Sequence, residues 1–150
     1  MKTIINRLGL RLVKESSKSY DLVTHITRPI EAVYILNDVS ELNIRAEEVF
    51  VIITLDNANR LTGLFEVSVG SLNSSIVNPR EVFKRAILNN AKSIVMAHNH
   101  PSGVLEPSKE DIDITKKLVA VGELLGIEVF DHIIVGKDDD YISFRREGII

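Results

Sequence analysis

The sequence predicts a mixed α/β domain in which helices flank one mixed β-sheet. Apolar runs of strand length alternate along the chain with segments whose apolar residues recur at helical spacing. Most of these segments begin or end with residues that are typical of helix caps and tight turns. The chain has 150 residues, a common size for one domain with a single core, so we expect residues 1–150 to form one domain.

The expected elements follow from these signals in chain order. Strands are predicted where apolar and β-branched residues run together, at 8–13, 49–55, 61–69, 93–97, 127–135 and 141–144. Helices are predicted at 27 to about 39, at 78 to about 91, and at 108 to about 125. The turn residues at 56–59 join two of the strands into a hairpin.

The helices have clear end signals. Pro29 is tolerated in a first turn, and Asn78 is a cap residue followed by Pro79 at the first helical position. Ser108 opens the last helix and Gly126 ends it. The apolar stripes that should face the core are Ala32, Val33, Leu36 and Val39, then Val82, Phe83, Ala86, Ile87 and Ala91, then Ile112, Thr115, Leu118, Val119 and Leu125.

Composition excludes several classes of function. The chain has no cysteine, which removes disulfides, thiolate ligands and thiol catalysis and favours a cytoplasmic location. No apolar stretch is long enough to span a membrane. The net charge of -3 does not support nucleic-acid binding, although basic pairs such as Lys84 and Arg85 leave a local patch open. Such pairs are usually solvated surface.

The segment 98–111 carries the most informative chemistry. His98 and His100 follow a predicted strand, so in an extended chain both imidazoles project to one side while Asn99 points away. Asp111 follows in the first turn of the next predicted helix. Two imidazoles and one carboxylate leave a tetrahedral zinc ion one ligand short, which is typical of a catalytic rather than a structural site.

Ser108 and Asp111 also have a structural interpretation. A serine followed three residues later by an acid forms a capping box, and an acid in a first turn is favoured by the helix dipole. Taken alone, this pair indicates a cap. Its occurrence shortly after the His-x-His pair favours a metal site, and one aspartate can serve both roles.

The spacing His-x-His, seven residues, Ser-x-x-Asp resembles the JAMM, or MPN-plus, metalloprotease signature. The longer strings Ala97-His-Asn-His-Pro-Ser-Gly103, Asn78-Pro-Arg-Glu-Val-Phe83 and Asp131-His-Ile-Ile-Val-Gly136 resemble the RadC family. The resemblance covers about residue 27 to the C-terminus. It is to a short form, without the helix-hairpin-helix region of full-length RadC proteins, and it implies the cytidine-deaminase-like JAB/MPN fold.

The resemblance also implies roles for single residues. His98, His100 and Asp111 match the ligands of one Zn²⁺ ion, and Ser108 matches the residue that steadies the tetrahedral intermediate. The catalytic glutamate of the family falls just before the first core strand, which is Glu48 in this sequence. Glu47 stays open as the alternative, because the strand that follows is apolar on both faces and does not determine the register.

These observations lead to a hypothesis of function with two alternatives. The first is a zinc-dependent metallopeptidase that hydrolyses an amide or isopeptide bond of a peptide or protein. The others are a DNA-repair-associated factor and a non-catalytic MPN interaction module. Among the remaining polar residues, His132 is expected to be a buried hydrogen-bonded residue oriented by Asp131, His25 a surface residue, and Ser102 part of a turn. Oligomeric state is not predicted.

Overall fold

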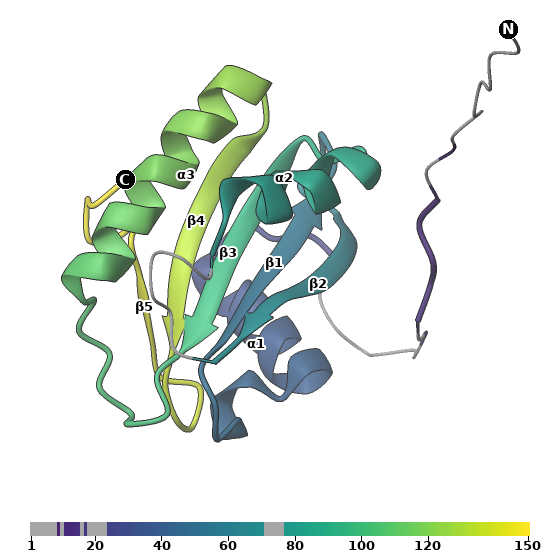
Figure 1. Ribbon diagram of the computed structural model, residues 1–150. Coiled ribbons are helices and arrows are strands. Elements are labelled where there is room, and N and C mark those ends of the chain that lie inside the picture. Colours follow the sequence, from purple (N-terminus) through teal and green to yellow (C-terminus); the bar gives the residue numbers. More distant parts are fainter. Residues whose placement is uncertain (1–8, 10, 16, 18–23, 71–76) are drawn as a thin grey trace, which may run out of the picture.

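The computed structural model describes residues 9, 11–15, 17, 24–70 and 77–150. Their helices and strands alternate as the sequence predicts, and one mixed sheet flanked by helices confirms the expected fold class (Figure 1). The elements are α1 (Pro29–Ser40), the short 3₁₀ helix η1 (Leu42–Ile44), β1 (Val49–Leu55), β2 (Leu61–Val69), α2 (Pro79–Leu88), β3 (Ser93–Asn99), α3 (Lys109–Leu125), β4 (Glu128–Val135) and β5 (Tyr141–Ser143).

The sheet has the strand order β2-β1-β3-β4-β5. β1 pairs antiparallel with both β2 and β3, while β3 and β4 are parallel and β5 is antiparallel to β4. Helix α3 makes the connection between the two parallel strands, as a parallel pair requires. The strand β1 lies inside the sheet, and all seven of its residues are buried, which explains why its sequence is apolar at nearly every position.

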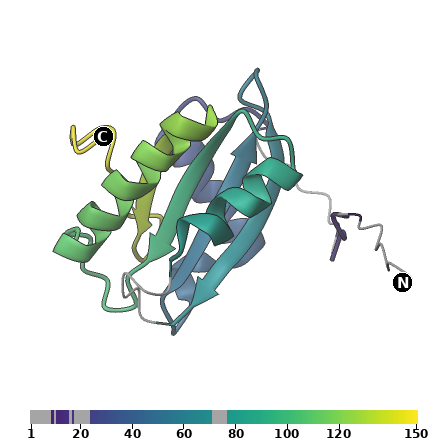
Figure 2. The ribbon, with the colours of Figure 1, turned by 45° about the horizontal axis from the view of Figure 1, so that its top comes forward.

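The sheet separates two apolar layers. Alternate residues of β1 and β3 face opposite sides: Val51 and Ala97 pack with helix α1, whereas Ile52 and Met96 pack with helices α2 and α3. Figures 1 and 2 show α1 on one face of the sheet and both other helices on the opposite face. By the same alternation, His98 lies on the face of β3 that α3 covers.

Some sequence expectations are wrong in detail. Gly9 and the described residues 11–13 form no strand, and Leu12 and Val13 are exposed; a strand needs a partner to satisfy its backbone, and the described part of the chain offers them none. Leu8 and Leu10 lie outside the described residues. Three predicted stripe residues in the last turns of their helices are exposed: Val39, Ile87 and Leu125. Helix α2 also ends at Leu88 rather than near Ala91.

Within the described ranges, no helix is long and apolar enough to cross a bilayer. The longest of them, α3, has 17 residues and carries charged side chains through its first half.

At one end of the sheet, where β3 stops and β1 starts, parts of the chain that are distant in sequence lie close together. The carboxyl end of β3 reaches this end of the sheet, and β1 begins there because it runs antiparallel to β3. The segment after β3 then turns back to the start of α3, where Ser108 caps the helix. Carboxyl ends of parallel strands are common ligand sites in α/β sheets, and the chemistry of segment 98–111 lies at this one.

Candidate metal centre

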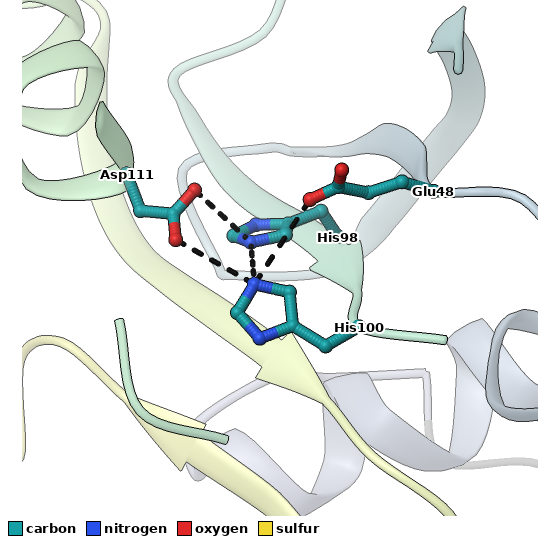
Figure 3. Close-up of side chains that lie close together, drawn as sticks. All are labelled: Glu48, His98, His100 and Asp111. Atoms are coloured by element: carbon teal, nitrogen blue, oxygen red, sulfur yellow. Dashed lines mark hydrogen bonds and ion pairs between the residues drawn. The ribbon is translucent and has the colours of Figure 1, made fainter. Parts of the chain in front are cut away.

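Four side chains point toward a common centre at this end of the sheet (Figure 3). They are Glu48, His98, His100 and Asp111, and one potential ligand atom from each lies within 4.8 Å of all the others. His98 and Asp111 are buried, while His100 and Glu48 are partly accessible. The structure therefore brings together both histidines and the aspartate of the sequence motif, and it adds the upstream glutamate.

Backbone register explains this convergence. His98 pairs with Phe50 across β3 and β1, so the next step of the antiparallel register places His100 opposite Glu48. His98 and His100 lie two residues apart at the end of β3 and project to one side. Asp111 comes from the first turn of α3, which packs over the same face of the sheet.

The distances between the ligand atoms fit a tetrahedral metal ion. Zinc binds nitrogen and oxygen ligands at about 2.0–2.1 Å, so two ligands of a regular tetrahedron lie roughly 3.3 Å apart. The Nε2 atoms of His98 and His100 are 3.0 Å apart, and they lie 3.3 and 3.5 Å from the two oxygens of Asp111. The Glu48 carboxylate stands farther off, with Oε1 3.9 Å from His100 Nε2. The two imidazole nitrogens and the Asp111 carboxylate thus surround one position at separations close to this value, and Glu48 lies beside them.

The tautomer of His100 is fixed by its own loop. Gly103 donates its backbone N–H to the carbonyl of His100 and adopts a φ of +80°, so residues 100–103 form a tight turn. This turn returns the Val104 carbonyl to the His100 ring, where it lies 2.5 Å from Nδ1. A carbonyl only accepts, so Nδ1 carries the proton and a neutral His100 directs the lone pair of Nε2 to the centre.

The charges around the centre favour a cation. Burial raises the pKa of the Asp111 carboxyl, but the adjacent His100 and His98 rings outweigh burial and hold this pKa well below its usual range. The Asp111 carboxylate in turn raises the pKa of His100 by more than burial lowers it. The carboxylate is therefore anionic, and two nitrogen lone pairs 3.0 Å apart require a proton or a metal ion between them.

Ser108 forms the predicted capping box with Asp111. The Ser108 hydroxyl donates to Asp111 Oδ2 at 2.7 Å and accepts from the Asp111 backbone N–H at 3.1 Å, and the Ser108 backbone N–H donates to the same Oδ2 at 2.8 Å. These bonds fix the carboxylate so that its other oxygen, Oδ1, faces His98. The same hydrogen bonds thus cap the helix and orient the Asp111 carboxylate, which agrees with the expectation that one aspartate can serve both roles.

Glu48 and Glu47 are placed differently by the start of β1. Glu48 directs its carboxylate to the centre, whereas Glu47 is exposed and lies outside the four-residue group. The backbone on both sides of Glu48 is held by Asn99, a buried residue between the two histidines of the motif. Its side chain accepts from Val49 N at 2.8 Å and donates to Glu47 O at 3.0 Å and Arg45 O at 3.2 Å.

Asn99 does point away from the histidines, as the sequence predicts, but the sequence pattern indicates no role for it. Its three hydrogen bonds should make it a major support of the Glu48 segment. We expect Asn99→Ala to lower the free energy of unfolding by about 2–4 kcal/mol, because it leaves buried backbone groups without partners. Urea unfolding measures this loss. The exposed turn residue Asn57 supplies the control, and an Asn99→Ala variant no less stable than Asn57→Ala would refute the supporting role.

The sequence as a whole matches one known protein family. A sequence model described as the RadC-like JAB domain matches residues 26–149, which is most of the chain. The chain belongs to the RadC family. This agrees with the resemblance seen in the sequence motifs and with the mixed sheet flanked by helices.

Two curated relatives of the chain are named as UPF0758 proteins. The chain is 43% identical over 145 residues to a UPF0758 protein of Desulfitobacterium hafniense, covering 96% of this chain and 63% of that protein. It is 52% identical over 104 residues to a UPF0758 protein of Methanosarcina acetivorans, covering 69% of this chain and 45% of that protein. The chain therefore spans less than two thirds of the length of these relatives.

The other polar residues of this RadC-family chain are also placed by the structure. His25 is exposed, as predicted, and its backbone forms an isolated antiparallel β-bridge with Arg60. His132 is fully buried and lies behind His98, with its Nε2 2.9 Å from His98 Nδ1. The interpretation that Asp131 orients the His132 ring is wrong: the Asp131 carboxylate accepts instead from Ser143 Oγ and from backbone N–H groups, including that of His132.

A cavity of about 420 Å³ adjoins the group on the side of His100. It lies between the segment 43–46, which leads to Glu48, and the segment 135–138, which follows β4. Because His100 and Asn99 line this cavity, a molecule bound in it would lie next to the candidate metal centre.

Proposed function

We propose that this RadC-family protein is a zinc-dependent metallopeptidase that hydrolyses an amide or isopeptide bond. The observation that carries the proposal is the set of three ligand residues: the two imidazole Nε2 atoms lie 3.0 Å apart, and the two Asp111 oxygens lie 3.3 and 3.5 Å from them. The Glu48 carboxylate stands farther from His100, at 3.9 Å. Three protein ligands with a remaining open corner are typical of catalytic zinc, whereas structural zinc has four.

His98, His100 and Asp111 hold one Zn²⁺ ion in this proposal. When bound, the ion supplies Lewis-acid chemistry, polarising a carbonyl oxygen and making water more acidic near neutral pH. Glu48 lies at the same centre with a partly accessible carboxylate. It takes the proton of the attacking water as general base and delivers it to the leaving amine as general acid.

Ser108 steadies the negative charge that develops on the carbonyl oxygen. Its hydroxyl has one proton, which in this structure is donated to Asp111. A contact with the substrate oxygen therefore requires the hydroxyl to rotate away from Asp111. The backbone N–H of Ser108 still holds the carboxylate after this rotation, so the ligand keeps its orientation.

The proposed substrate is a peptide or protein. The cavity beside His100 has room for part of such a chain, and amide bonds are the substrates implied for JAMM-type sites. The cytoplasmic location suggested by the absence of cysteine in the sequence belongs to the same proposal.

The test combines metal content with cleavage. Protein loaded with Zn²⁺ and freed of excess metal is incubated with a panel of linear peptides and of isopeptides formed on lysine, and products are read by mass spectrometry. We expect one zinc ion per chain and cleavage of at least one panel member, both lost in His100→Ala. His25→Ala, which removes an exposed histidine, should retain both. A zinc-loaded protein that cleaves no amide bond in the panel would contradict the proposal.

A further inference from the structure

A buried chain of hydrogen-bonding groups runs from the metal centre into the core behind His98. His98 Nδ1 lies 2.9 Å from His132 Nε2, and His132 Nδ1 lies 2.5 Å from the Thr115 hydroxyl. Thr115 Oγ1 lies 2.5 Å from the backbone carbonyl of Asp111. All members of this chain are buried, and its two ends, His98 and Asp111, both belong to the candidate ligand set.

The surroundings of His132 leave its ring no other polar partner among the residues that the structure describes. The ring is enclosed by Phe144 and Phe50, at centroid distances of 4.6 and 5.6 Å. Each ring nitrogen of His132 therefore has one polar partner, His98 Nδ1 for Nε2 and the Thr115 hydroxyl for Nδ1. A neutral imidazole donates from one nitrogen and accepts at the other.

A metal ion at His98 sets the direction of every bond in this chain. An ion on Nε2 leaves the proton of His98 on Nδ1, from which it is donated to Nε2 of His132. His132 must then carry its own proton on Nδ1 and donate it to the Thr115 hydroxyl. Thr115 in turn donates to the Asp111 carbonyl, which lies 2.5 Å from its hydroxyl oxygen and can only accept.

We propose that Thr115 and His132 are positioning residues that hold His98 in the tautomer whose Nε2 is free to bind a metal ion. The inference rests on the metal-binding part of the proposed function and does not depend on the reaction. Partners of this kind, placed behind a ligand histidine, usually fix both its tautomer and its ring orientation.

If every hydrogen bond between Thr115, His132 and His98 ran the other way, the three side chains would carry the same number of protons, but the metal site would be blocked. If the Thr115 hydroxyl donates to His132 Nδ1, His132 carries its proton on Nε2 and donates to His98 Nδ1. The proton of His98 then lies on Nε2, where it faces Asp111 Oδ1 at 3.3 Å and occupies the position of the ion. The metal-binding arrangement therefore needs the Thr115 hydroxyl to accept the hydrogen bond from His132 Nδ1.

Thr115→Val tests this role, because valine keeps the β-branched shape and removes the acceptor. His132 then has no partner for a proton on Nδ1, and the blocking tautomer is favoured. We expect the Kd for Zn²⁺, measured by competition with a chelator, to rise about 10–100-fold. Thr115→Ser keeps the hydroxyl and should therefore retain the wild-type Kd. Thr54→Val, which removes another buried and hydrogen-bonded hydroxyl at the far end of β1, should leave it unchanged.

A second measurement needs no variant. In the zinc-loaded wild-type protein, ¹H–¹⁵N correlation of the imidazoles should show the proton of His132 on Nδ1 and none on Nε2. A proton on His132 Nε2, or an unchanged Kd for Zn²⁺ in Thr115→Val, would overturn the inference. Neither readout uses a substrate, so a protein that binds zinc through this chain but cleaves no peptide would retain the inference while the proposed reaction fails.

Discussion

Asp111→Asn should weaken zinc binding by about two orders of magnitude or more. Zinc sites with four protein ligands bind with about 10–16 kcal/mol, or roughly 3 kcal/mol per ligand, and 3 kcal/mol is a factor of more than about 10² in Kd. Asparagine keeps the size of the side chain but removes the anionic oxygens that lie 3.3 and 3.5 Å from the two Nε2 atoms. Chelator competition with Zn²⁺ measures the change, and hydrolysis at limiting zinc should fall with it.

Glu110→Gln is the matched control for this experiment. Glu110 precedes Asp111 in the first turn of α3, so its removal takes the same charge from the helix start. Its side chain is exposed and lies outside the metal-ligand group, and we expect the zinc affinity to change little. Equal losses in the two variants would show that the helix dipole, rather than coordination, accounts for the effect, and Asp111 would then not be a ligand.

Glu48→Gln should abolish most of the activity while the metal stays bound. A positioned general acid–base group contributes typically about 10²–10⁴-fold to the rate, so we expect kcat to fall by a factor in this range. The amide has the same size and can still accept a hydrogen bond, but it cannot take up the proton of the attacking water. Steady-state kinetics on a cleaved panel substrate measure the loss, together with the zinc content of the same sample.

Glu47→Gln separates the two neighbouring acids. Glu47 is exposed, and its backbone carbonyl, not its carboxylate, contacts Asn99. We expect its variant to retain wild-type kcat and zinc content. A large loss of kcat in Glu47→Gln with none in Glu48→Gln would transfer the proposed base to Glu47. If Glu48→Gln also loses its zinc, then Glu48 acts as a ligand and the open corner of the proposed site is filled by protein.

These two experiments distinguish the two kinds of residue in the site. Loss of Asp111 should raise the Kd for zinc and lower the activity only because less zinc is bound. Excess zinc should therefore restore part of the rate. Loss of Glu48 should change kcat at full zinc occupancy, so added zinc should restore none of it. The distinction follows from geometry, because Asp111 lies at tetrahedral distance from both imidazole nitrogens and Glu48 does not.

The sequence by itself was sufficient for features that depend on near neighbours in the chain. The runs 49–55 and 61–69 predicted both strands of the hairpin, and Asn78 and Ser108 predicted the starts of two helices. The His-x-His spacing at a strand end placed two imidazoles on one side, because side chains alternate along a strand with a period of two. Ser108 and Asp111 were paired correctly because a capping box spans only three residues.

Tertiary structure decided what depends on residues far apart in sequence. Glu48 lies 50 positions before His98, and only the antiparallel register of β1 and β3 directs it, rather than Glu47, to the centre. The same register gives Asn99 its partners at 45–49. Thr115 looked like one more inner residue of its helix until β4 placed His132 against it. Local patterns specify which way a side chain faces along its own element, but the packing of elements decides what it meets there.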